Sequence, residues 1–375
     1  MGERRDVKRI LLVLGTSAGG VGRHVRMLAE GFAQRGHRVV VAGPPSTEET
    51  FRFSAAGAVF APVAIAERPR PASDLRAAAT LRRLARGGQG PHAVHAHGLR
   101  AGALAGLALT GTATPLVVTL HNALTAGGAT GAVYGVLERI VAARAARILV
   151  VSPDLGERMT ALRARHVEPA VVPAPPLRPP ARPVAEVRAE LGAEPGRPVL
   201  LTIARLAQQK GLEMLLDVAA GLAGPDAPLF AVAGDGPLRA RLQDRIDAEG
   251  LPVRLLGDRG DVPDLLAAAR LLVAPSRWEG QPLNVQEALR AGRPVIATAV
   301  GGVPAMVGDA GLLVPYGDAA GMRAAIGRVL GDPELAGNLE RAATRRGSEL
   351  PGEEEAVTAA LAAYPVAATP GDDRP

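Results

Sequence analysis

The feature that most constrains the fold is an alternation of short β-rich runs with helical patterns, which occurs in both halves of the chain. Parallel strands need long crossover connections, usually helices, so this alternation is typical of parallel sheets. It predicts an α/β protein. The predicted strands are 9–14, 37–42, 93–97, 116–120 and 148–151 in the first half and 199–203, 229–233, 253–256, 271–274 and 295–298 in the second, and the helices of the first half are 22–35, 74–86 and 133–144.

A proline-rich stretch, 167–183, separates the two halves. Proline fixes φ and has no N–H to donate, so this stretch favours a stiff, extended connector. We therefore predict two Rossmann-like domains with parallel sheets facing a central cleft, because ligands of such sheets bind outside the carboxyl ends of the strands. The predicted parts are an N-terminal domain over 1–166, the connector over 167–183, a C-terminal domain over 184–349, and a short helix (353–363) with a flexible tail within 350–375.

Composition excludes several classes of protein. The chain has no cysteine, which rules out disulfides, thiolate metal sites and a cysteine nucleophile, and which fits a reducing, cytoplasmic compartment. No stretch approaches the ~18 apolar residues of a membrane span. The apolar run 10–14 follows basic residues but is too short for a signal peptide, so we interpret it as the first strand.

Charge is divided unevenly along the chain. Residues 1–166 contain 22 Lys and Arg against 10 Asp and Glu, whereas 167–375 contain 21 against 27. The N-terminal half is therefore expected to attract an anionic partner. Aromatic residues make up only 2% of the chain, which disfavours single-stranded nucleic acid as that partner.

The predicted helix 74–86 concentrates this positive charge. One interpretation is a solvated helix face; the other is reversible attachment to an anionic bilayer at the inner face of the membrane, or to a phosphorylated lipid acceptor. The charged side is made of Arg76, Arg82, Arg83 and Arg86, with Leu75, Ala78, Leu81 and Ala85 as the predicted buried side.

The stretch 276–298 places two carboxylates around a turn. Glu279 lies in the loop that follows a predicted strand, and a helix with Pro282 at its first position carries Glu287. In an α/β sheet this loop lies where a ligand binds. The only tryptophan of the chain, Trp278, is in the same loop, so the loop holds a residue that the chain otherwise avoids.

The helix of this stretch has a core face and a ligand face. Val285, Ala288 and Leu289 follow helical spacing and are predicted to be buried, which leaves Asn284 and Glu287 on another side. The free N–H groups at the start of the helix form a site for an anion or a hydroxyl group. The alternative is a surface helix in which Glu287 makes an ordinary ion pair.

Lysine is nearly absent from the chain. Of 43 basic residues only Lys8 and Lys210 are lysine, and Lys210 stands at the start of a predicted helix, shortly after Arg205 at a strand end. Two cations beside free helix N–H groups predict a phosphate clamp. The alternative is a solvated strand-to-helix turn.

The glycine-rich turn 16–24 follows the first strand. It lacks the third glycine of the G-x-G-x-x-G fingerprint, which disfavours a site for NAD(P). Gly19 and Gly20 still allow the backbone to approach a ligand closely, and the alternative is an ordinary tight turn.

The histidines divide into two groups. His95 and His97 lie on one face of a predicted strand, but the sequence offers no nearby carboxylate or further histidine to complete a zinc set, so no metal site is predicted. His121 follows the strand 116–120 and is expected to face the predicted cleft, with a purely structural histidine as the alternative.

Five segments together resemble the retaining nucleotide-sugar glycosyltransferases of family 4, which have the GT-B fold. The resemblance covers most of residues 8–345 and includes the seven-residue spacing between Glu279 and Glu287. The segments are T-L-H-N (119–122), A-R-L…Q-K-G (204–211), A-G-D-G-P-L (233–238), E-G-Q-P-L-N-V-Q-E (279–287) and G-R-P-V-I-A-T (292–298).

The resemblance implies a hexosyltransferase-like enzyme of glycan biosynthesis. It would move a sugar from a nucleotide-diphosphate donor to a lipid or glycan acceptor, forming an α-glycosidic bond with retention and without an obligatory metal or other cofactor. Arg205 and Lys210 would hold the diphosphate, Glu287 the ribose, and Glu279 the sugar hydroxyls. The implied catalytic residues are His121, Arg205, Lys210 and Glu279, and the implied donor-binding residues are Gly19, Gly20, Arg205, Lys210, Glu279, Gly280, Gln281, Leu283, Asn284 and Glu287.

The chain also departs from the family pattern. Gln281 and Pro282 stand where the family often has an aromatic residue and a glycine, and Ala204 stands where glycine is common. Two alternative functions follow from the same fold. One is a non-catalytic GT-B protein that binds a sugar nucleotide, and the other is a GT-B enzyme that hydrolyses or epimerises one.

Overall fold

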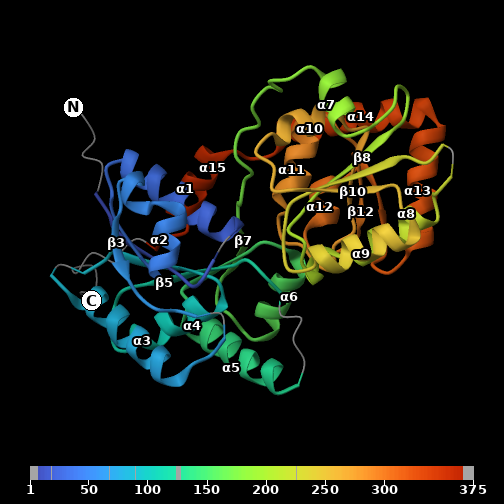
Figure 1. Cartoon of the computed structure of the whole chain (residues 1–375). Helices are drawn as coiled ribbons and strands as arrows, with labels where there is room; N and C mark the ends of the chain where they lie inside the picture. Colours follow the sequence, from blue (N-terminus) through green and yellow to red (C-terminus); the bar gives the residue numbers. More distant parts are fainter. Residues whose placement is uncertain are drawn as a thin grey trace, which may run out of the picture. The chain divides into compact units, whose positions relative to one another are not determined.

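The computed structural model describes residues 7–365 except 18, 67, 89, 124–127 and 225. The chain divides into two compact units. The first is formed by residues up to Val172 together with those from Pro351 onward, and the second by Pro173–Leu350 (Figure 1).

The first unit is built on a parallel sheet. Among the described residues it has seven strands in the order β3-β2-β1-β4-β5-β6-β7. Because β1, β4 and β5 are adjacent and parallel, their carboxyl ends meet at one edge, as the predicted βαβ units require. The strands are β1 (Arg9–Leu14), β2 (Arg38–Gly43), β3 (Val59–Pro62), β4 (Ala93–His97), β5 (Leu116–Leu120), β6 (Arg147–Val150) and β7 (Val167–Pro169).

Helices of the first unit form two groups. Helix α4 packs between α3 and α5, whereas α1 packs against α15, the helix that the last part of the chain contributes (Figure 1). The helices are α1 (Gly20–Gln34), α2 (Pro45–Phe51), the 3₁₀ helix η1 (Phe53–Ala56), α3 (Pro71–Arg86), α4 (Leu99–Ala108), α5 (Gly128–Arg144), α6 (Pro153–Ala161) and α15 (Glu353–Ala362).

The second unit is also built on a parallel sheet. Its described residues form six strands in the order β10-β9-β8-β11-β12-β13. The strands are β8 (Val199–Ile203), β9 (Leu229–Ala233), β10 (Val253–Gly257), β11 (Leu271–Ala274), β12 (Val295–Thr298) and β13 (Gly311–Val314). The helices are α7 (Val184–Glu190), η2 (Gln208–Lys210), α8 (Leu212–Ala220), α9 (Arg239–Glu249), α10 (Val262–Ala268), α11 (Leu283–Arg290), α12 (Val303–Val307), α13 (Ala319–Gly331) and α14 (Pro333–Glu349).

Two apolar cores enclose the sheet of the second unit. Successive residues of a strand point to opposite faces, so Val199 and Leu201 lie in one core and Leu200 in the other. The first core includes side chains of α7, α10 and α11, and the second includes side chains of α8, α9 and α13. Helices therefore cover both faces, which is the α/β architecture that the alternation predicts.

The predicted connector is shorter in the structure than in the sequence pattern. Its first residues, Val167–Pro169, form strand β7, which pairs with β6. The first unit therefore continues to Val172, because pairing with a neighbouring strand stabilises these residues in spite of the prolines. The end of the chain is divided too: α15 belongs to the first unit, while the predicted tail after Pro365 lies outside the described residues.

The segment after α15 is anchored in the first unit. Tyr364 is 3% exposed, and its hydroxyl lies 3.0 Å from Nδ1 of His95. The other ring nitrogen of His95, Nε2, lies 2.7 Å from Oγ1 of Thr119. The ring of Tyr364 also packs edge-on against Phe32 of α1, with centroids 5.9 Å apart. These contacts connect the C-terminal segment to two central strands and to α1.

Candidate functional site

Two loops of the second unit bring Lys210 and Glu279 together. Nζ of Lys210 lies 2.6 Å from Oε1 of Glu279, and the hydroxyl of Ser276 donates to the same oxygen at 2.6 Å. Glu279 is only 6% exposed, so its charge needs these partners to offset the loss of hydration. Two of the predicted site residues, the partly exposed Lys210 and the buried Glu279, therefore form one charge pair. Ser276 is a third member that was not predicted from the sequence.

Backbone contacts hold the two loops in register. Gly211, which follows Lys210, has φ +63°, and a Cβ atom there would lie 2.0 Å from the carbonyl oxygen of Pro275. Nε2 of Gln209 donates to the carbonyl of Trp278 at 3.0 Å, and the N–H of Arg277 donates to the carbonyl of Gln209 at 2.8 Å. The glycine of the Q-K-G segment is thus needed for the close approach that places Lys210 beside Glu279.

The other side of Glu279 is fixed by the turn after β12. Gly301 has φ +53°, and a Cβ atom there would lie 1.9 Å from the carbonyl oxygen of Glu279. That carbonyl accepts the N–H of Gly302 at 3.0 Å, and Oγ1 of Thr298 donates to the carbonyl of Ser276 at 2.5 Å. The loop that carries Glu279 is therefore held between two backbone segments, which orients its side chain before any ligand binds.

Arg205 has an exposed side chain on a firmly held backbone. The neighbouring residue Leu206 accepts the N–H of Leu238 at 3.0 Å and donates its own N–H to Asp235 at 2.9 Å. A Cβ atom on Gly236 would lie 2.5 Å from the carbonyl oxygen of Leu206, which explains a glycine of the A-G-D-G-P-L segment. Within the described residues the guanidinium of Arg205 has no hydrogen-bond or ion-pair partner, so its charge is available for an anion.

Helix α11 agrees with its predicted core face. Val285, Ala288 and Leu289 are fully buried. Pro282 is the residue before the helix rather than its first residue, with φ −67° and ψ 121°. The amide Nδ2 of Asn284 donates to the carbonyl of Ile203 at 2.9 Å, which ties the helix start to the end of β8.

The remaining residues predicted to bind the donor lie in the same loop and helix. Gly280 is buried, and Gln281, Leu283 and Glu287 are partly exposed. Gln286, which the sequence argument did not single out, is 2% exposed and its Oε1 accepts the N–H of Ala174 at 2.8 Å. Gln286 therefore binds the backbone of the connector to helix α11.

Four histidines gather in the first unit. The rings of His97 and His121 have centroids 5.5 Å apart, and Nδ1 of His97 lies 3.2 Å from Nε2 of His121. His24 of α1 lies edge-on to both, at 5.6 Å and 5.5 Å, and His95 packs on His97 at 4.2 Å. The four side chains come from α1, β4 and the residue after β5, so only the fold brings them together.

The sequence pattern did not indicate which histidines meet in the fold. His24 and His121 reach His95 and His97 from neighbouring elements. Even so, across the described part of the chain no three His, Asp or Glu side chains are arranged to hold a metal ion.

Burial keeps the cluster neutral. Loss of hydration lowers the pKa of His95 to about 3 and that of His121 to about 4, with the charge of His121 adding to the effect on His95. Burial, followed by neighbouring imidazoles, also lowers the pKa of His24 and His97 well below the usual value. Near pH 7 each ring therefore has one N–H and one free lone pair.

We expect the first unit to lose stability as the pH falls from about 6.5 toward 4. In the unfolded chain these imidazoles take up protons near pH 6.5, whereas folded His121 does so only near 4 and His95 near 3. The unfolded state thus binds more protons in this window, and above it both states are neutral and the contribution is constant. Thermal unfolding at several pH values measures this, and a midpoint that rises on acidification would contradict it.

The glycine-rich turn serves packing as well as access. Gly19 precedes α1, Gly20 is its first residue, and both are exposed. The hydroxyl of Ser17 accepts the N–H of Gly22 at 3.1 Å, and a Cβ atom on Gly22 would collide with the ring of Phe51. Space therefore remains open at Gly19, whereas Gly22 is required by the core.

The basic helix α3 differs from its prediction in two ways. Leu75 is 73% exposed and Ala78 is partly exposed, because the stripe that faces the core is Ala77, Leu81 and Ala85. Arg82 donates from Nη1 to the carbonyls of Ala108 and Thr110 at 2.9 Å and 2.8 Å, so it supplies hydrogen bonds to carbonyl groups at the end of α4. The exposed charged side is therefore Arg76, Arg83 and Arg86, beside the exposed Leu75.

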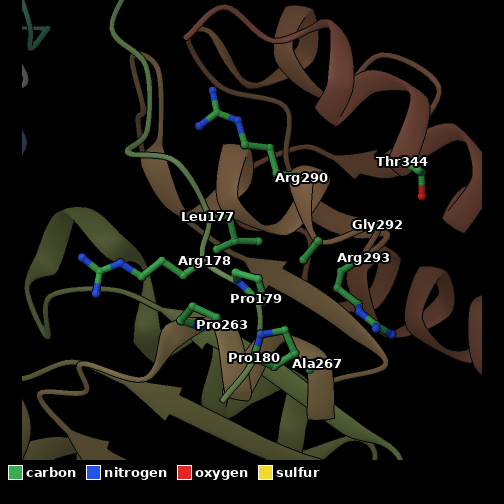
Figure 2. A pocket seen from close by; sticks show the side chains of 11 residues that line it. Leu177, Arg178, Pro179, Pro180, Pro263, Ala267, Arg290, Gly292, Arg293 and Thr344 are labelled. Carbon is green, nitrogen blue, oxygen red and sulfur yellow. The ribbon is translucent and has the colours of Figure 1, made fainter. Parts of the chain in front are cut away.

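A separate cavity of about 530 Å³ lies under the connector of the second unit (Figure 2). Its floor is apolar, with Leu177, Pro263 and neighbouring prolines, and Figure 2 shows that the guanidinium groups of Arg178, Arg290 and Arg293 point away from one another. They do not converge on a single anion. None of the predicted site residues lines this cavity.

No helix in the described part of the chain is long and apolar enough to cross a membrane.

Two family models match the chain, one in each half. The model described as "Glycosyl transferase 4-like domain" matches residues 19–175, and the model described as "Glycosyl transferases group 1" matches residues 197–332. The first match includes His121 and residues 19–24 of the glycine-rich turn, and the second includes Arg205, Lys210 and Glu279.

Individual proteins resemble the chain in part or in fold. An alpha-D-kanosaminyltransferase of Streptomyces kanamyceticus is 36% identical over 159 residues, which cover 40% of this chain and 41% of that protein. The chain thus aligns with less than half of this relative. Sucrose-phosphate synthase from Thermosynechococcus elongatus has a TM-score of 0.79 at 22% identity, covering 95% of this chain and 98% of that one. Anabaena HepE in complex with UDP and glucose has a TM-score of 0.78 at 19% identity, covering 95% and 99%.

Proposed function

The chain belongs to the GT-B glycosyltransferases, and from this premise we propose that it transfers a sugar from a nucleotide-diphosphate donor to an acceptor hydroxyl. We further propose retention at the anomeric carbon, an α-glycosidic product, and no requirement for a metal. Of the structural observations, the pairing of Lys210 with buried Glu279 supports this function best, and Arg205 of the same unit has an exposed side chain.

The cations suit a diphosphate leaving group. When the bond between sugar and phosphate breaks, negative charge builds up on the diphosphate, and fixed positive groups stabilise it. The ammonium of Lys210 has three N–H donors and gives one to Glu279, so others remain for phosphate oxygens. Arg205 adds a planar guanidinium without a partner among the described residues. This arrangement could neutralise the leaving group with side chains alone.

Glu279 suits the hydroxyls of the transferred sugar. Lys210 and Ser276 both bond its Oε1, and within the described residues no partner is found for Oε2. An ionised carboxylate accepts hydrogen bonds only, so Oε2 would accept from sugar hydroxyls. Glu287 of α11 is proposed to bond the ribose, and the backbone around Gly280 and Leu283 to border the donor.

His121 is proposed to act near the anomeric carbon, and Gly19 and Gly20 are proposed to border the donor diphosphate and the acceptor. A neutral imidazole can donate one hydrogen bond to an oxygen without bringing a charge. The open space at Gly19 would let a ligand approach the backbone of the turn, with Gly20 beside it. The acceptor is proposed to be a lipid-linked or other glycan.

Donor consumption with and without acceptor tests the function. A thermal-shift screen of nucleotide sugars would first identify the donor, and UDP-glucose is the first to try, because HepE of the same fold binds UDP and glucose. A transferase consumes the donor faster when acceptor is present and yields an α-linked product. Equal consumption without acceptor would indicate a hydrolase or epimerase, and a thermal shift without consumption would indicate a binding protein.

We expect weak, salt-sensitive binding of the chain to acidic vesicles. Arg76, Arg83 and Arg86 of α3 are exposed beside Leu75, and each such cation adds about 1 kcal/mol near an anionic surface. Vesicle sedimentation measures the bound fraction, with neutral vesicles as the control. The variant Arg76→Gln/Arg83→Gln should bind less, and Arg241→Gln, which removes an exposed cation of the second unit, serves as its match. Equal retention on acidic and neutral vesicles would contradict the attachment and leave a soluble acceptor as the better interpretation.

A further inference from the structure

We propose that His97 is a positioning residue for His121: it donates from Nδ1–H to Nε2 of His121 and so fixes His121 as the tautomer that carries its proton on Nδ1. The inference rests on the proposed role of His121 in sugar transfer, and it concerns a residue that would not touch the substrate itself. The supporting observation is the distance of 3.2 Å between Nδ1 of His97 and Nε2 of His121.

The strand register places the two rings side by side. His97 is the last residue of β4 and pairs with Thr119 of β5, two residues before His121. His97 is only 2% exposed, and its ring is packed between His95 and His24, at centroid distances of 4.2 Å and 5.6 Å. The ring of His97 therefore cannot turn away without disturbing the core, and its nitrogen is held toward His121.

The protons in this contact can be arranged in two ways. Both rings are neutral near pH 7, so one nitrogen of the contact carries a proton and the other offers a lone pair. Either His97 donates and His121 has its proton on Nδ1, or His121 donates and His97 has its proton on Nε2.

The surroundings of His97 Nε2 decide between these arrangements. This atom is buried and has no hydrogen-bond partner among the described residues. If His121 were the donor, an N–H group of His97 would be buried without an acceptor, which is rare in folded proteins. If His97 is the donor, Nε2 is only an unused lone pair, which is tolerated more often. The first arrangement is therefore favoured.

The consequence for His121 is a defined donor. With its Nε2 occupied by His97, the ring presents Nδ1–H as its remaining polar group. His121 is partly exposed, so this N–H can reach an oxygen of a ligand. In the opposite tautomer the same nitrogen would be an acceptor and could not donate to that oxygen.

Nitrogen NMR of the whole wild-type chain tests the tautomer directly. In the histidine-labelled protein, two-bond correlations between ring carbon-bound protons and ring nitrogens distinguish Nδ1–H from Nε2–H. The expected result at pH 7 is an Nδ1–H pattern for His121, assigned by its loss in His121→Ala. An Nε2–H pattern would overturn the proposal. This measurement needs no activity, so it stands even if the chain proves not to transfer sugar.

Two variants test the effect on the reaction. In His97→Asn the amide nitrogen occupies the place of Nδ1 and can still donate, whereas His97→Leu cannot. We expect His97→Leu to lower kcat about 10- to 100-fold with little change in the KM for donor, and His97→Asn to recover most of it. His166→Leu, at an exposed histidine, is the control. Equal kcat values for wild type and His97→Leu would overturn the proposal. If His97→Leu does not fold, His97→Asn provides the test instead. The proposal would then be overturned if His121 kept its Nδ1–H tautomer in His97→Asn while kcat fell as low as in His121→Ala.

Discussion

The Arg205→Ala variant is expected to lower donor turnover about 10²- to 10³-fold while leaving the free energy of unfolding within ~0.5 kcal/mol of wild type. The large effect on rate follows from the loss of a cation that would stabilise the departing diphosphate. The small effect on stability follows from the structure, since the side chain is exposed and makes no hydrogen bond or ion pair with any described residue.

Lys210→Ala should cost as much in rate but, unlike Arg205→Ala, it should also destabilise the chain. The sequence alone predicts that neither substitution disturbs the fold. The structure changes this for Lys210, because its removal leaves the buried carboxylate of Glu279 with Ser276 as its remaining side-chain partner among the described residues. Breaking a buried pair typically costs about 3–5 kcal/mol, and the partial exposure of Lys210 places the expected loss below that range.

A double variant separates charge loss from misfolding. Lys210→Ala/Glu279→Gln removes both charges, so it should recover stability relative to Lys210→Ala while remaining inactive. Donor turnover and denaturant unfolding of purified variants measure the two effects, with Arg241→Ala as the matched surface control. Near-normal turnover in both Arg205→Ala and Lys210→Ala would overturn the diphosphate assignment.

His121→Ala is expected to lower the transfer rate about 10²- to 10³-fold, the usual loss when one positioned hydrogen-bond donor to the reacting groups is removed. Donor nucleotide affinity should fall much less, because the proposed diphosphate and ribose contacts are made by residues of the second unit. Burial lowers the pKa of His121 to about 4, so this side chain should add no pH dependence to kcat between about pH 6 and 8.

Calorimetry with the nucleoside diphosphate and steady-state rates of transfer decide this prediction. His166→Ala, at an exposed histidine of the same unit, is the control. If nucleotide affinity fell as far as the rate, His121 would have a structural role or belong to the nucleotide site.

Central strands and the edge strand β10 could be predicted from the sequence, whereas three other edge strands could not. The boundaries of β1, β4, β5, β8, β9, β11 and β12 agree with the predicted ranges, because a buried parallel strand is a continuous apolar run. The strands β3, β7 and β13 were missed. All three lie at sheet edges. In β3 and β7, exposed residues or a proline interrupt the apolar pattern, and pairing with one neighbour stabilises the strand instead. Strand β13 has only four residues, Gly311–Val314, and none of them is exposed or a proline.

Site residues were predicted by rarity and position, but their partners were not. The scarcity of lysine pointed to Lys210, and the loop position pointed to Glu279. That the two form one pair with Ser276 depends on two loops meeting across the ends of β8 and β11, which no local pattern encodes. The histidine cluster was missed for the same reason: His24 lies far from His97 and His121 in sequence.

The return of α15 to the first unit has a consequence for biosynthesis. The ribosome makes residues 353–364 only after the whole of the second unit, yet Val357 fills the space beside Gly31, and Tyr364 packs on Phe32 of α1. In a nascent chain, the apolar patch on α1 therefore stays uncovered while the whole of the second unit, Pro173–Leu350, is translated. The second unit is continuous in sequence and can complete its fold first. The first unit is completed last, when α15 packs against α1.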